Sequence, residues 1–479
     1  ALAMTANPDR YAQTRMGYGS KLRTTEQLDR QFGGQPHYRF FRNLLKEGMD
    51  YFFETDLSEE QRVQELDANL ERGNHKSATS EPAVTKSQLL KDVKHGFSFP
   101  FPKSLVKKLK GALVQPCGLA SQFALQADGS RVEKHRLTHD LSYEITSKNI
   151  SVNNRVDMSR YPEMIFGWCL PRIIHFIVAL RLAYPNSRIL IAKYDFSDAY
   201  RRITHSAEAA AQTIIVLAGI AFLALRLSFG GSPNPPTWCS FSEMVTDLSN
   251  EIPLCDWDSS KLRSPGQPET PVPKLLDSNT PLAQGRSLAV SIPTTVTGHT
   301  DSFIDDLIRV FLDTDENRET QPHAVPLAIF VSNRPHAGDA EPVPRRENLS
   351  GPKLEAEGTP AEVQIVLGWE MNTRQLLVIL PLDKFIAWTE DLSDAIRSKT
   401  VTLGRLHTLV GRLNHAAYVI PLSRHFLGRL RQRLHFVRNS HQEITLSKEE
   451  LADLSLWVRF LLNARQGISM NLLTLRKPS

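Results

Sequence analysis

Apolar residues recur at helical spacing near both ends of the chain and once in its middle. Residues 57–70 begin with Ser58 as a helix cap and carry acids in the first turn, within a polar, helix-prone lead-in of about 85 residues. Residues 172–183 show the same periodicity. Three more helices are expected after Ser393, at 403–416, 422–434 and 451–462. The pattern therefore predicts a helical start and an all-helical end.

Strand-like patterns lie between these helical regions. Residues 91–141 are short apolar pieces broken by prolines, and the Asp128-Gly129 turn is flanked as in a β-hairpin. SRILIAKYDF, residues 187–196, reads as a strand that carries Asp195 at its end. A mixed α and β fold is expected.

The longest apolar run, at 214–225, is interrupted by Gly219. It is shorter than the roughly 20 residues that span a bilayer, so we predict two buried strands and no membrane partner. Two other stretches, 251–300 and 333–360, are rich in Pro, Ser and Thr and have little periodicity. They are predicted to be an insertion and an extended loop.

An acidic pair interrupts the apolar segment SFIDDLIRV, residues 302–310. Successive side chains of a strand face opposite ways, so Asp305 and Asp306 can approach one site only from a tight turn between two strands. Grouping them with Asp195 raises their pKa values unless a cation neutralises them. Carboxylate ligands favour magnesium or manganese, and phosphoryl transfer between two such ions explains a need for three acids. A solvated Asp-Asp turn is the alternative for this segment alone.

The composition says more about the cellular compartment of the protein than about its function. The 479 residues are 41% hydrophobic and 23% charged, and the formal charge of +5 permits a polyanionic partner without requiring one. The four cysteines lie far apart, with no CxxC pair and no His at zinc spacing: Cys117, Cys169, Cys239 and Cys255. We therefore expect neither a disulfide framework nor a zinc site, and a reducing intracellular compartment. The N-terminus shows no signal-peptide pattern.

The order of six short segments along the chain is informative. They are KHRLTHDLS (134–142), SVNN (151–154), KYDFSDAYRRI (193–203), RLSFGGSPNPP (226–236), FIDD (303–306) and VLGWEM (366–371). In this order they resemble the fingers and palm motifs of reverse transcriptases from eukaryotic retrotransposons, of the gypsy-like or DIRS-like kind with relatives in algae and protists. The resemblance covers about residues 90–435. It implies an α+β right-hand polymerase with fingers, a ferredoxin-like palm and a helical thumb.

The resemblance also implies a division of the chain. We expect a helical N-terminal extension at 1–90, fingers at 91–193, a palm at 194–390 with the 251–300 insertion, and a helical thumb or connection at 391–479.

Site residues follow from the matched positions. Asp195 and Asp305 match metal ligands, Asp306 matches the less direct partner of that pair, and two Mg²⁺ ions, or Mn²⁺ in their place, are implied. Tyr200 matches the aromatic that excludes a 2'-hydroxyl; plain core packing is its alternative. The other nucleotide-binding candidates are Lys134, Arg136, Phe196, Phe229 and Gly230. Lys134 and Arg136 sit two apart, so both can face one phosphate group from a strand; a solvated basic strand is the alternative.

Further candidates lie after the palm motifs. Lys353 is the candidate for the lysine that protonates the leaving pyrophosphate. Gly368 and Trp369 match a hairpin that grips the primer, with an ordinary buried hairpin as the alternative. Residues 421–440 contain no acid and form a basic amphipathic pattern suited to a phosphate backbone, with Arg424, Arg429, Arg431, Arg433 and Arg438. A solvated helix and a calmodulin- or membrane-binding helix are the alternatives.

The resemblance therefore predicts an RNA-directed DNA polymerase that adds deoxynucleotides to a primer 3'-end on an RNA or DNA template. Two alternatives remain. One is an inactive or domesticated protein that binds nucleic acid without polymerising it. The other is an RNA-dependent RNA polymerase, which has no reason to keep an aromatic residue at Tyr200. Oligomeric state is not indicated.

Overall fold

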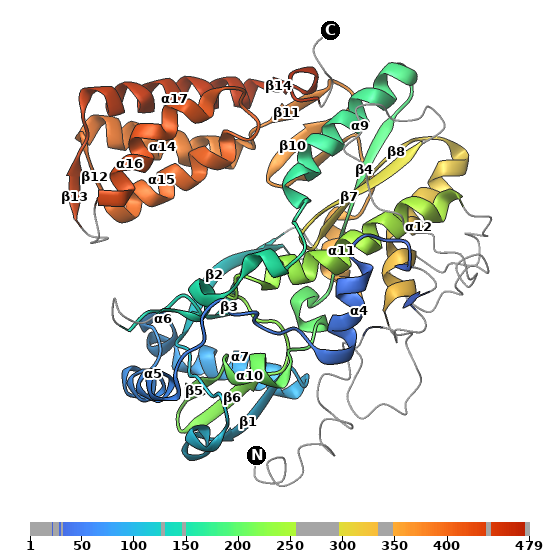
Figure 1. Cartoon of the computed structure of the whole chain (residues 1–479). Coiled ribbons are helices and arrows are strands. Elements are labelled where there is room, and N and C mark those ends of the chain that lie inside the picture. The colour runs from blue at the N-terminus through green and yellow to red at the C-terminus, as the bar shows by residue number, and fades with distance from the viewer. Residues whose placement is uncertain are drawn as a thin grey trace.

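A computed structural model describes most of the chain: residues 22, 28–29, 32–125, 130–145, 150–254, 297–333, 348–436 and 442–474. Helices and strands are mixed, and several of the sheets join strands that lie far apart in the sequence, as Figure 1 shows. The protein is thus an α+β structure, as the sequence predicts.

A three-stranded antiparallel sheet lies at the centre of the molecule (Figure 1), in the order β4(Ile189–Asp195), β8(Asp306–Leu312), β7(Gly298–Phe303). Strands β4 and β8 are apolar along most of their length and are buried on both faces, whereas β7 carries the buried polar residues Thr300, Asp301 and Ser302. On one face, Leu190 and Tyr194 pack with helices α11(Asn234–Glu251) and α12(Asp315–Ser332). On the other, Ile189 and Ile191 pack against α9(Cys169–Ala183). The predicted central helix and the strand ending at Asp195 are both confirmed.

Helix α4(Tyr38–Glu47) covers the outer side of α11 (Figure 1). The rings of Phe41 and Phe241 stack with centroids 5.0 Å apart, and Gln35 donates a buried hydrogen bond of 2.8 Å to Asp247. Helix α4 therefore belongs to the same hydrophobic core as the central sheet.

The lower part of Figure 1 contains the next N-terminal elements. A hairpin pairs β2(Cys117–Leu125) with β3(Arg131–His139), and a second sheet has the order β1(Ser98–Pro102), β6(Ile220–Ala224), β5(Ile215–Leu217). The predicted hairpin and the two predicted strands of the apolar run are confirmed. Short helices surround them: α5(Glu59–Arg72), α6(Lys76–Ser80), α7(Pro82–Lys94), α8(Val152–Arg155) and α10(Ala207–Ala211). The Ser58 cap is also confirmed, as part of a capping box with Gln61.

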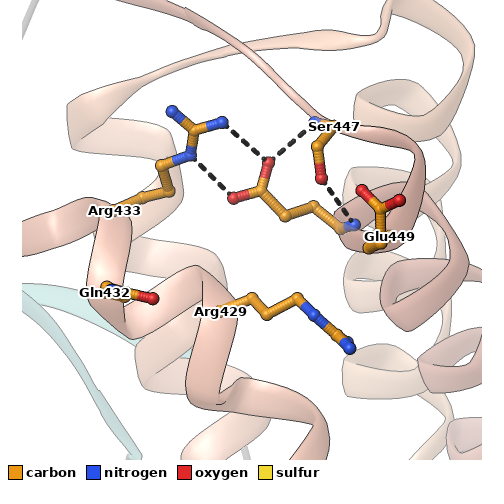
Figure 2. Close-up of a pocket in the computed structure, with 6 residues that line it drawn as sticks. Arg429, Gln432, Arg433, Ser447 and Glu449 are labelled. Carbon is orange, nitrogen blue, oxygen red and sulfur yellow. Dashed lines mark hydrogen bonds and ion pairs between the residues drawn. The ribbon is translucent and has the colours of Figure 1, made fainter.

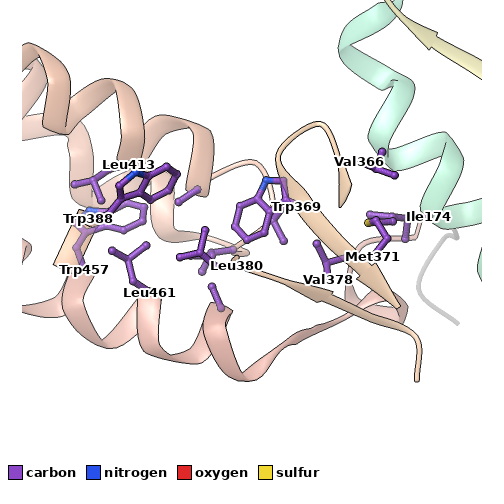
Figure 3. Packing of buried hydrophobic residues seen from close by; sticks show 14 of the residues in the cluster. Ile174, Val366, Trp369, Met371, Val378, Leu380, Trp388, Leu413, Trp457 and Leu461 are labelled. Carbon is purple, nitrogen blue, oxygen red and sulfur yellow. The ribbon is translucent and has the colours of Figure 1, made fainter. Parts of the chain in front are cut away.

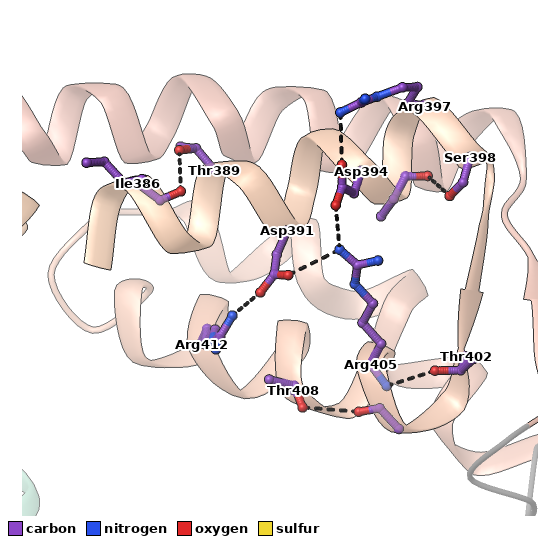
Figure 4. A network of polar contacts seen from close by, with 12 residues as sticks. Ile386, Thr389, Asp391, Asp394, Arg397, Ser398, Thr402, Arg405, Thr408 and Arg412 are labelled. Carbon is purple, nitrogen blue, oxygen red and sulfur yellow. Dashed lines mark hydrogen bonds and ion pairs between the residues drawn. The ribbon is translucent and has the colours of Figure 1, made fainter. Parts of the chain in front are cut away.

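Four helices form the C-terminal region: α14(Leu382–Ser398), α15(Leu403–Ala416), α16(Gly428–Phe436) and α17(Lys448–Gln466). Ion pairs join α16 to α17 (Figure 2), among them Arg433 with Glu450 at 2.8 Å. A buried core runs from Trp457 and Trp388 to Trp369 and on to Ile174 of α9 (Figure 3), so the helices and the centre of the molecule share one core. On the surface, Asp391 pairs with Arg405 and Arg412 and ties α14 to α15 (Figure 4).

Small strands occur within this region too, so the prediction of an all-helical end is wrong in part. The strands β12(Thr400–Thr402) and β13(Glu443–Thr445) pair with each other. A four-stranded sheet leads into the helices, in the order β14(Ile468–Ser469), β11(Leu377–Ile379), β10(Trp369–Asn372), β9(Val363–Val366). Such strands are too short for an alternating pattern to stand out in the sequence. Turns of 3-10 helix complete the fold: Lys103–Lys108, Met158–Arg160, Phe166–Trp168, Ala199–Arg202, Ile252–Leu254, Ser423–Leu427 and Met470–Leu472.

The two predicted loop regions differ from expectation where they are described. Within 333–360, Gly351–Glu357 form a helix, α13, which docks on β4. The 251–300 region ends in the first residues of β7 rather than in a loop, and 255–296 lie outside the described residues.

Among the described residues, one helical stretch, Phe166–Ala183, is long and apolar enough to cross a membrane. It lies between the central sheet and the C-terminal region (Figure 1). Of this stretch, 56% is buried inside the protein, as is common for a core helix.

Candidate active site

Three aspartates meet at one end of the central sheet. In the antiparallel register of β4 and β8, Asp195 lies directly opposite Asp306, so the two side chains share a face of the sheet. Asp305 belongs to the two-residue turn between β7 and β8, where Ile304 has φ of 60°. The predicted hairpin tip is confirmed, and this turn lets the adjacent Asp305 approach the same site.

The carboxylates perturb one another. Burial raises the pKa of Asp195 to about 7; the ammonium of Lys353 opposes this shift, and Asp305 and Asp306 add to it. Burial and then the charge of Asp305 also raise the pKa of Asp306. Each carboxylate therefore lies within electrostatic reach of the other two, in surroundings that disfavour so much negative charge.

Helix α13 brings a cation to this cluster. Lys353 Nζ lies 2.7 Å from Asp195 Oδ1. One helical turn later, Glu357 pairs with Lys193 at 2.5 Å. Lys353 and Glu357 are four residues apart on one face of the helix, and Asp195 and Lys193 are two residues apart on one face of β4. The helix and the strand can therefore form both ion pairs at once. The backbone N–H of Ser350 donates to the Asp195 carbonyl at 3.0 Å and fixes the start of the helix.

The structure places Lys353, the candidate general acid, against Asp195, and the electrostatics of this contact show why the lysine stays charged. Burial acts to lower the pKa of Lys353, but the carboxylates of Asp195, Asp306 and Asp305 together outweigh burial and the pKa is raised. The ammonium is thus the cation that neutralises Asp195 in this structure.

A divalent metal suits this donor set. Within the described part of the chain, no three His, Cys, Asp or Glu groups are close enough to hold an ion as they stand. At Asp195, the Lys353 ammonium takes one carboxylate oxygen. The donors are nevertheless all carboxylate oxygens, the type that magnesium and manganese prefer, and burial together with the neighbouring carboxylates raises the pKa values of Asp195 and Asp306. The residues present therefore fit such an ion.

Tyr200 lies beside the aspartates, in the turn Ala199–Arg202 that follows β4. Its ring packs on Phe229 with centroids 5.4 Å apart and on Trp238 at 6.5 Å. Burial raises the pKa of the Tyr200 hydroxyl. Phe196 is buried and its ring meets Trp238 edge-on at 5.0 Å, so only its backbone is available to a ligand.

Gly230 follows Phe229 and permits a close backbone approach, as predicted, although the neighbour here is protein. Its φ is 123°, and a Cβ would lie 1.8 Å from the carbonyl oxygen of His139 at the end of β3. The Asn153 amide donates to the Gly230 carbonyl at 2.8 Å. These contacts lock the Phe229 segment onto the β2–β3 hairpin.

Lys134 and Arg136 share one face of β3, as their spacing predicts. The Arg136 guanidinium lies 5.0 Å from the centre of the Phe229 ring. Burial lowers the pKa of Lys134, and the positive charges of Arg136 and Lys91 lower it further. Lys91, in the last turn of α7, is therefore a third cation of this group, which the motif pattern did not indicate.

Gly368 occupies a tight turn between β9 and β10, with φ of 80°, next to Leu367 with φ of 48°. Lys384 Nζ donates to the Gly368 carbonyl at 2.8 Å. The Trp369 side chain is only 1% exposed and stacks on His415, with ring centroids 5.7 Å apart. The backbone of this turn, and not the indole of Trp369, is therefore the part open to a ligand.

The basic C-terminal pattern needs correction, because acids from another helix face it. Arg429 pairs with Asp453 at 2.7 Å and Arg433 with Glu450 at 2.8 Å, both across to α17. These side chains border a cavity of about 330 Å³ (Figure 2), lined by Arg429, Gln432, Arg433, Ser447, Glu449 and Glu450. The sequence window 421–440 lacks acids only because its partners come later in the chain.

Two other arginines of this pattern are described. Arg431 donates to the Asn414 amide oxygen, and the Arg424 guanidinium lies 5.0 Å from the centre of the exposed Tyr418 ring. Arg438 lies outside the described residues. Arg424 and Arg431 thus keep charge that no carboxylate in the described contacts neutralises.

The described cysteines, Cys117, Cys169 and Cys239, are buried, and Cys255 lies outside the described residues.

Comparisons with known proteins gave structural similarity alone. No protein-family model matches the sequence, and no curated protein matches it. The chain is similar to the foamy viral protease-reverse transcriptase in complex with RNA/DNA hybrid, with a TM-score of 0.46 and 11% identity, over 91% of this chain and 47% of that one. It is also similar to the foamy viral protease-reverse transcriptase dRH in complex with double-stranded DNA, with a TM-score of 0.45 and 12% identity, over 91% of this chain and 61% of that one. The chain thus spans about half to three fifths of these proteins, and we base the proposed function on its own residues.

Proposed function

We propose that this protein is an RNA-directed DNA polymerase, a nucleotidyltransferase that adds deoxynucleotides to the 3'-end of a primer on an RNA or DNA template. The observation that carries the proposal is the meeting of Asp195, Asp305 and Asp306 at one end of the central sheet, with Lys353 against Asp195. Three carboxylates beside a lysine, with the pKa values of Asp195 and Asp306 raised, form an arrangement suited to phosphoryl transfer.

The roles divide between anionic and cationic groups. Asp195, Asp305 and Asp306 would hold two Mg²⁺ ions, or Mn²⁺, which supply activation of the primer hydroxyl and neutralisation of the pyrophosphate. Lys134 and Arg136 lie on one face of β3 and are placed to meet phosphate oxygens of the incoming nucleotide.

Lys353 is the proposed general acid. Its raised pKa keeps the ammonium protonated at neutral pH, so it has a proton to give to a leaving pyrophosphate once it parts from Asp195.

Sugar selection is assigned to the aromatic pair. Tyr200 packs on Phe229, the residue before Gly230, and the charge of Asp305 acts on its hydroxyl. A ring in that position collides with a 2'-hydroxyl, so deoxynucleotides are favoured over ribonucleotides. This feature supports a DNA polymerase over an RNA polymerase.

In this proposal the central sheet with α9, α11 and α12 is the palm, so α9 and β4, which lie mostly within the range 91–193 expected for the fingers, are assigned to the palm instead. The β2–β3 hairpin region is the fingers, and the C-terminal helices are the thumb. The Gly368 turn contributes backbone to the primer grip, and Arg424 and Arg431 contribute to duplex binding. The order of the motifs supports a retrotransposon of the gypsy-like or DIRS-like kind as the source, and an intracellular site of action.

The test is extension of a DNA primer on an RNA template with Mg²⁺, comparing deoxynucleotides with ribonucleotides. Asp305→Asn removes one carboxylate charge from the cluster and should lower the extension rate by about a hundredfold or more while the fold is kept. Asp315→Asn is the matched control, because this aspartate is fully exposed at the start of α12.

The outcomes separate the alternatives. Deoxynucleotide extension that Asp305→Asn abolishes and Asp315→Asn leaves intact supports the proposal. Salt-sensitive duplex binding without extension refutes it in favour of a protein that only binds nucleic acid. Extension with ribonucleotides in preference refutes the assignment of Tyr200.

A further inference from the structure

A buried ion pair joins an N-terminal helix to the turn that carries Tyr200. Arg201, the residue after Tyr200, places Nη2 2.7 Å from Oδ2 of Asp92 in the last turn of α7. The two side chains are only 12% and 18% exposed. The two residues are 109 positions apart in the sequence, and Asp92 lies outside every motif considered above.

The same guanidinium reaches the second aromatic segment. Arg201 Nη1 donates to the carbonyl of Leu227 at 3.2 Å, two residues before Phe229. The N–H of Leu227 in turn donates to the carbonyl of Ile203 at 3.1 Å, just beyond the Tyr200 turn. One side chain therefore ties together the backbone segments that carry Tyr200 and Phe229.

Asp92 is itself held firmly. Its carbonyl accepts a hydrogen bond of 2.8 Å from the N–H of Phe97, and the Phe97 carbonyl accepts one of 2.9 Å from Leu225. The Arg201 guanidinium also lies 5.9 Å from the centre of the Phe97 ring. Helix α7 is thus anchored to the strand β6 region independently of the ion pair, so Asp92 acts as a fixed point from which Arg201 is oriented.

Burial makes the pair sensitive to the loss of either charge. Burial raises the pKa of Asp92, and the charge of Arg201 opposes that shift. Without the negative charge of Asp92, little would balance the positive charge of the Arg201 guanidinium in a site that is mostly closed to water. Arg201 would then turn toward solvent and release its bond to Leu227.

We propose that Asp92 is a positioning residue for sugar selection: through Arg201 it sets the Tyr200 and Phe229 rings, 5.4 Å apart, at the spacing that discriminates deoxynucleotides from ribonucleotides. This inference rests on the proposed function. It assigns to the N-terminal region a part in substrate choice, although Asp92 itself touches neither ring in the contacts described.

The experiment measures kcat and KM for a deoxynucleotide and for the matching ribonucleotide in single-nucleotide primer extension. Asp92→Asn keeps the shape of the side chain and removes its charge. We expect the ratio of the two kcat/KM values to fall by about tenfold, since the loss of about 1.4 kcal/mol of discrimination gives that factor. Most of the change should appear as a lower KM for the ribonucleotide and a higher KM for the deoxynucleotide, with kcat for the deoxynucleotide changed less.

Two further variants separate positioning from loss of structure. Arg172→Met breaks another buried ion pair, with Asp301, on the α9 side of the sheet. It should lower stability yet leave the discrimination ratio as in the wild type. The exchange Asp92→Arg with Arg201→Asp restores opposite charges and should recover part of the ratio. Arg201→Lys keeps the charge but has a single ammonium, so it should give a ratio between those of Asp92→Asn and the wild type.

Each outcome has one meaning. A folded Asp92→Asn protein whose ratio stays within twofold of the wild type overturns the proposal, and so does an Arg172→Met protein with an equal loss of discrimination. A wild-type protein that extends no primer overturns the proposed function and this inference with it. An active wild-type enzyme with an unaffected Asp92→Asn variant overturns the inference alone.

Discussion

Replacement of Lys353 by Met should make the protein bind Mn²⁺ more tightly in the absence of substrate. The Lys353 ammonium contacts Asp195 Oδ1 at 2.7 Å, and an ion that binds Asp195 must compete with it. Met has nearly the same length and no charge, so it removes the competitor while it preserves packing. The wild-type protein must release this contact each time the ion enters.

The size of the effect follows from exposure. Two unit charges about 4 Å apart attract by about 4 kcal/mol at an effective dielectric constant near 20. The Asp195 side chain is 13% exposed, but that of Lys353 is 43% exposed, so water screens the pair and the attraction must be discounted toward the value for surface ion pairs. A net effect of about 1 kcal/mol remains, which corresponds to about fivefold tighter binding.

The assay is titration of the nucleotide-free protein with Mn²⁺, followed by the electron paramagnetic resonance signal of the free ion. Glu357→Gln is the matched control, because it breaks the other ion pair between α13 and β4, with Lys193, and leaves Lys353 in place. This control should show no gain in affinity. Equal or weaker Mn²⁺ binding by Lys353→Met would refute the view that the lysine competes with the ion at Asp195.

Three other predictions concern stability and nucleic-acid binding. Gly230→Ala should lower the free energy of unfolding in urea by about 3 kcal/mol or more, because its Cβ would meet the His139 carbonyl oxygen at 1.8 Å, and an unchanged midpoint would contradict this. Burial lowers the pKa of His205 to about 4, so the unfolded state binds the proton first and the wild type loses stability as the pH falls from about 6.5 to 4. The free energy of unfolding of His205→Gln should therefore rise relative to that of the wild type by about 1.4 kcal/mol per pH unit over that window. Unfolding free energies that depend on pH equally in the two proteins would exclude the effect. Arg424→Ala should weaken duplex binding, measured by fluorescence anisotropy, and lower the salt dependence of binding by about one ion. Arg433→Ala should have a smaller effect, because Arg433 is already paired with Glu450 within the protein. Equal losses of affinity in the two variants would show that the pairing does not matter.

The sequence predicts those parts of the site that depend on local patterns. A short apolar run predicts the strand that ends at Asp195, and an acidic pair within another apolar run predicts the tip at Asp305 and Asp306. The common face of Lys134 and Arg136 also follows from spacing alone. Each of these features depends on residues within a few positions of one another, which is why a single sequence reveals them.

Contacts between distant segments explain what the sequence did not predict. Helix α13 has seven residues and begins with Gly-Pro, so its pattern resembles a loop, and its ion pairs with β4 stabilise it. The partners of Arg429 and Arg433 lie 24 and 17 residues further along, on α17, and they turn a basic pattern into a set of internal ion pairs. Asp92 and Lys91 belong to a polar helix that no motif marks, and only the folded chain brings them to the site.

The placement of α4 on α11 has a consequence during synthesis. The stacked rings of Phe41 and Phe241 are 200 positions apart, and at about 5 to 20 residues per second a ribosome needs about 10 to 40 s to cover that distance. Through that interval the apolar side of α4 has no helix to cover it, and contacts of such long range also slow folding. Nascent chains that stop before α11 should therefore be prone to aggregate, and a chaperone that holds the first 50 or so residues until α11 has left the ribosome should raise the yield of folded protein.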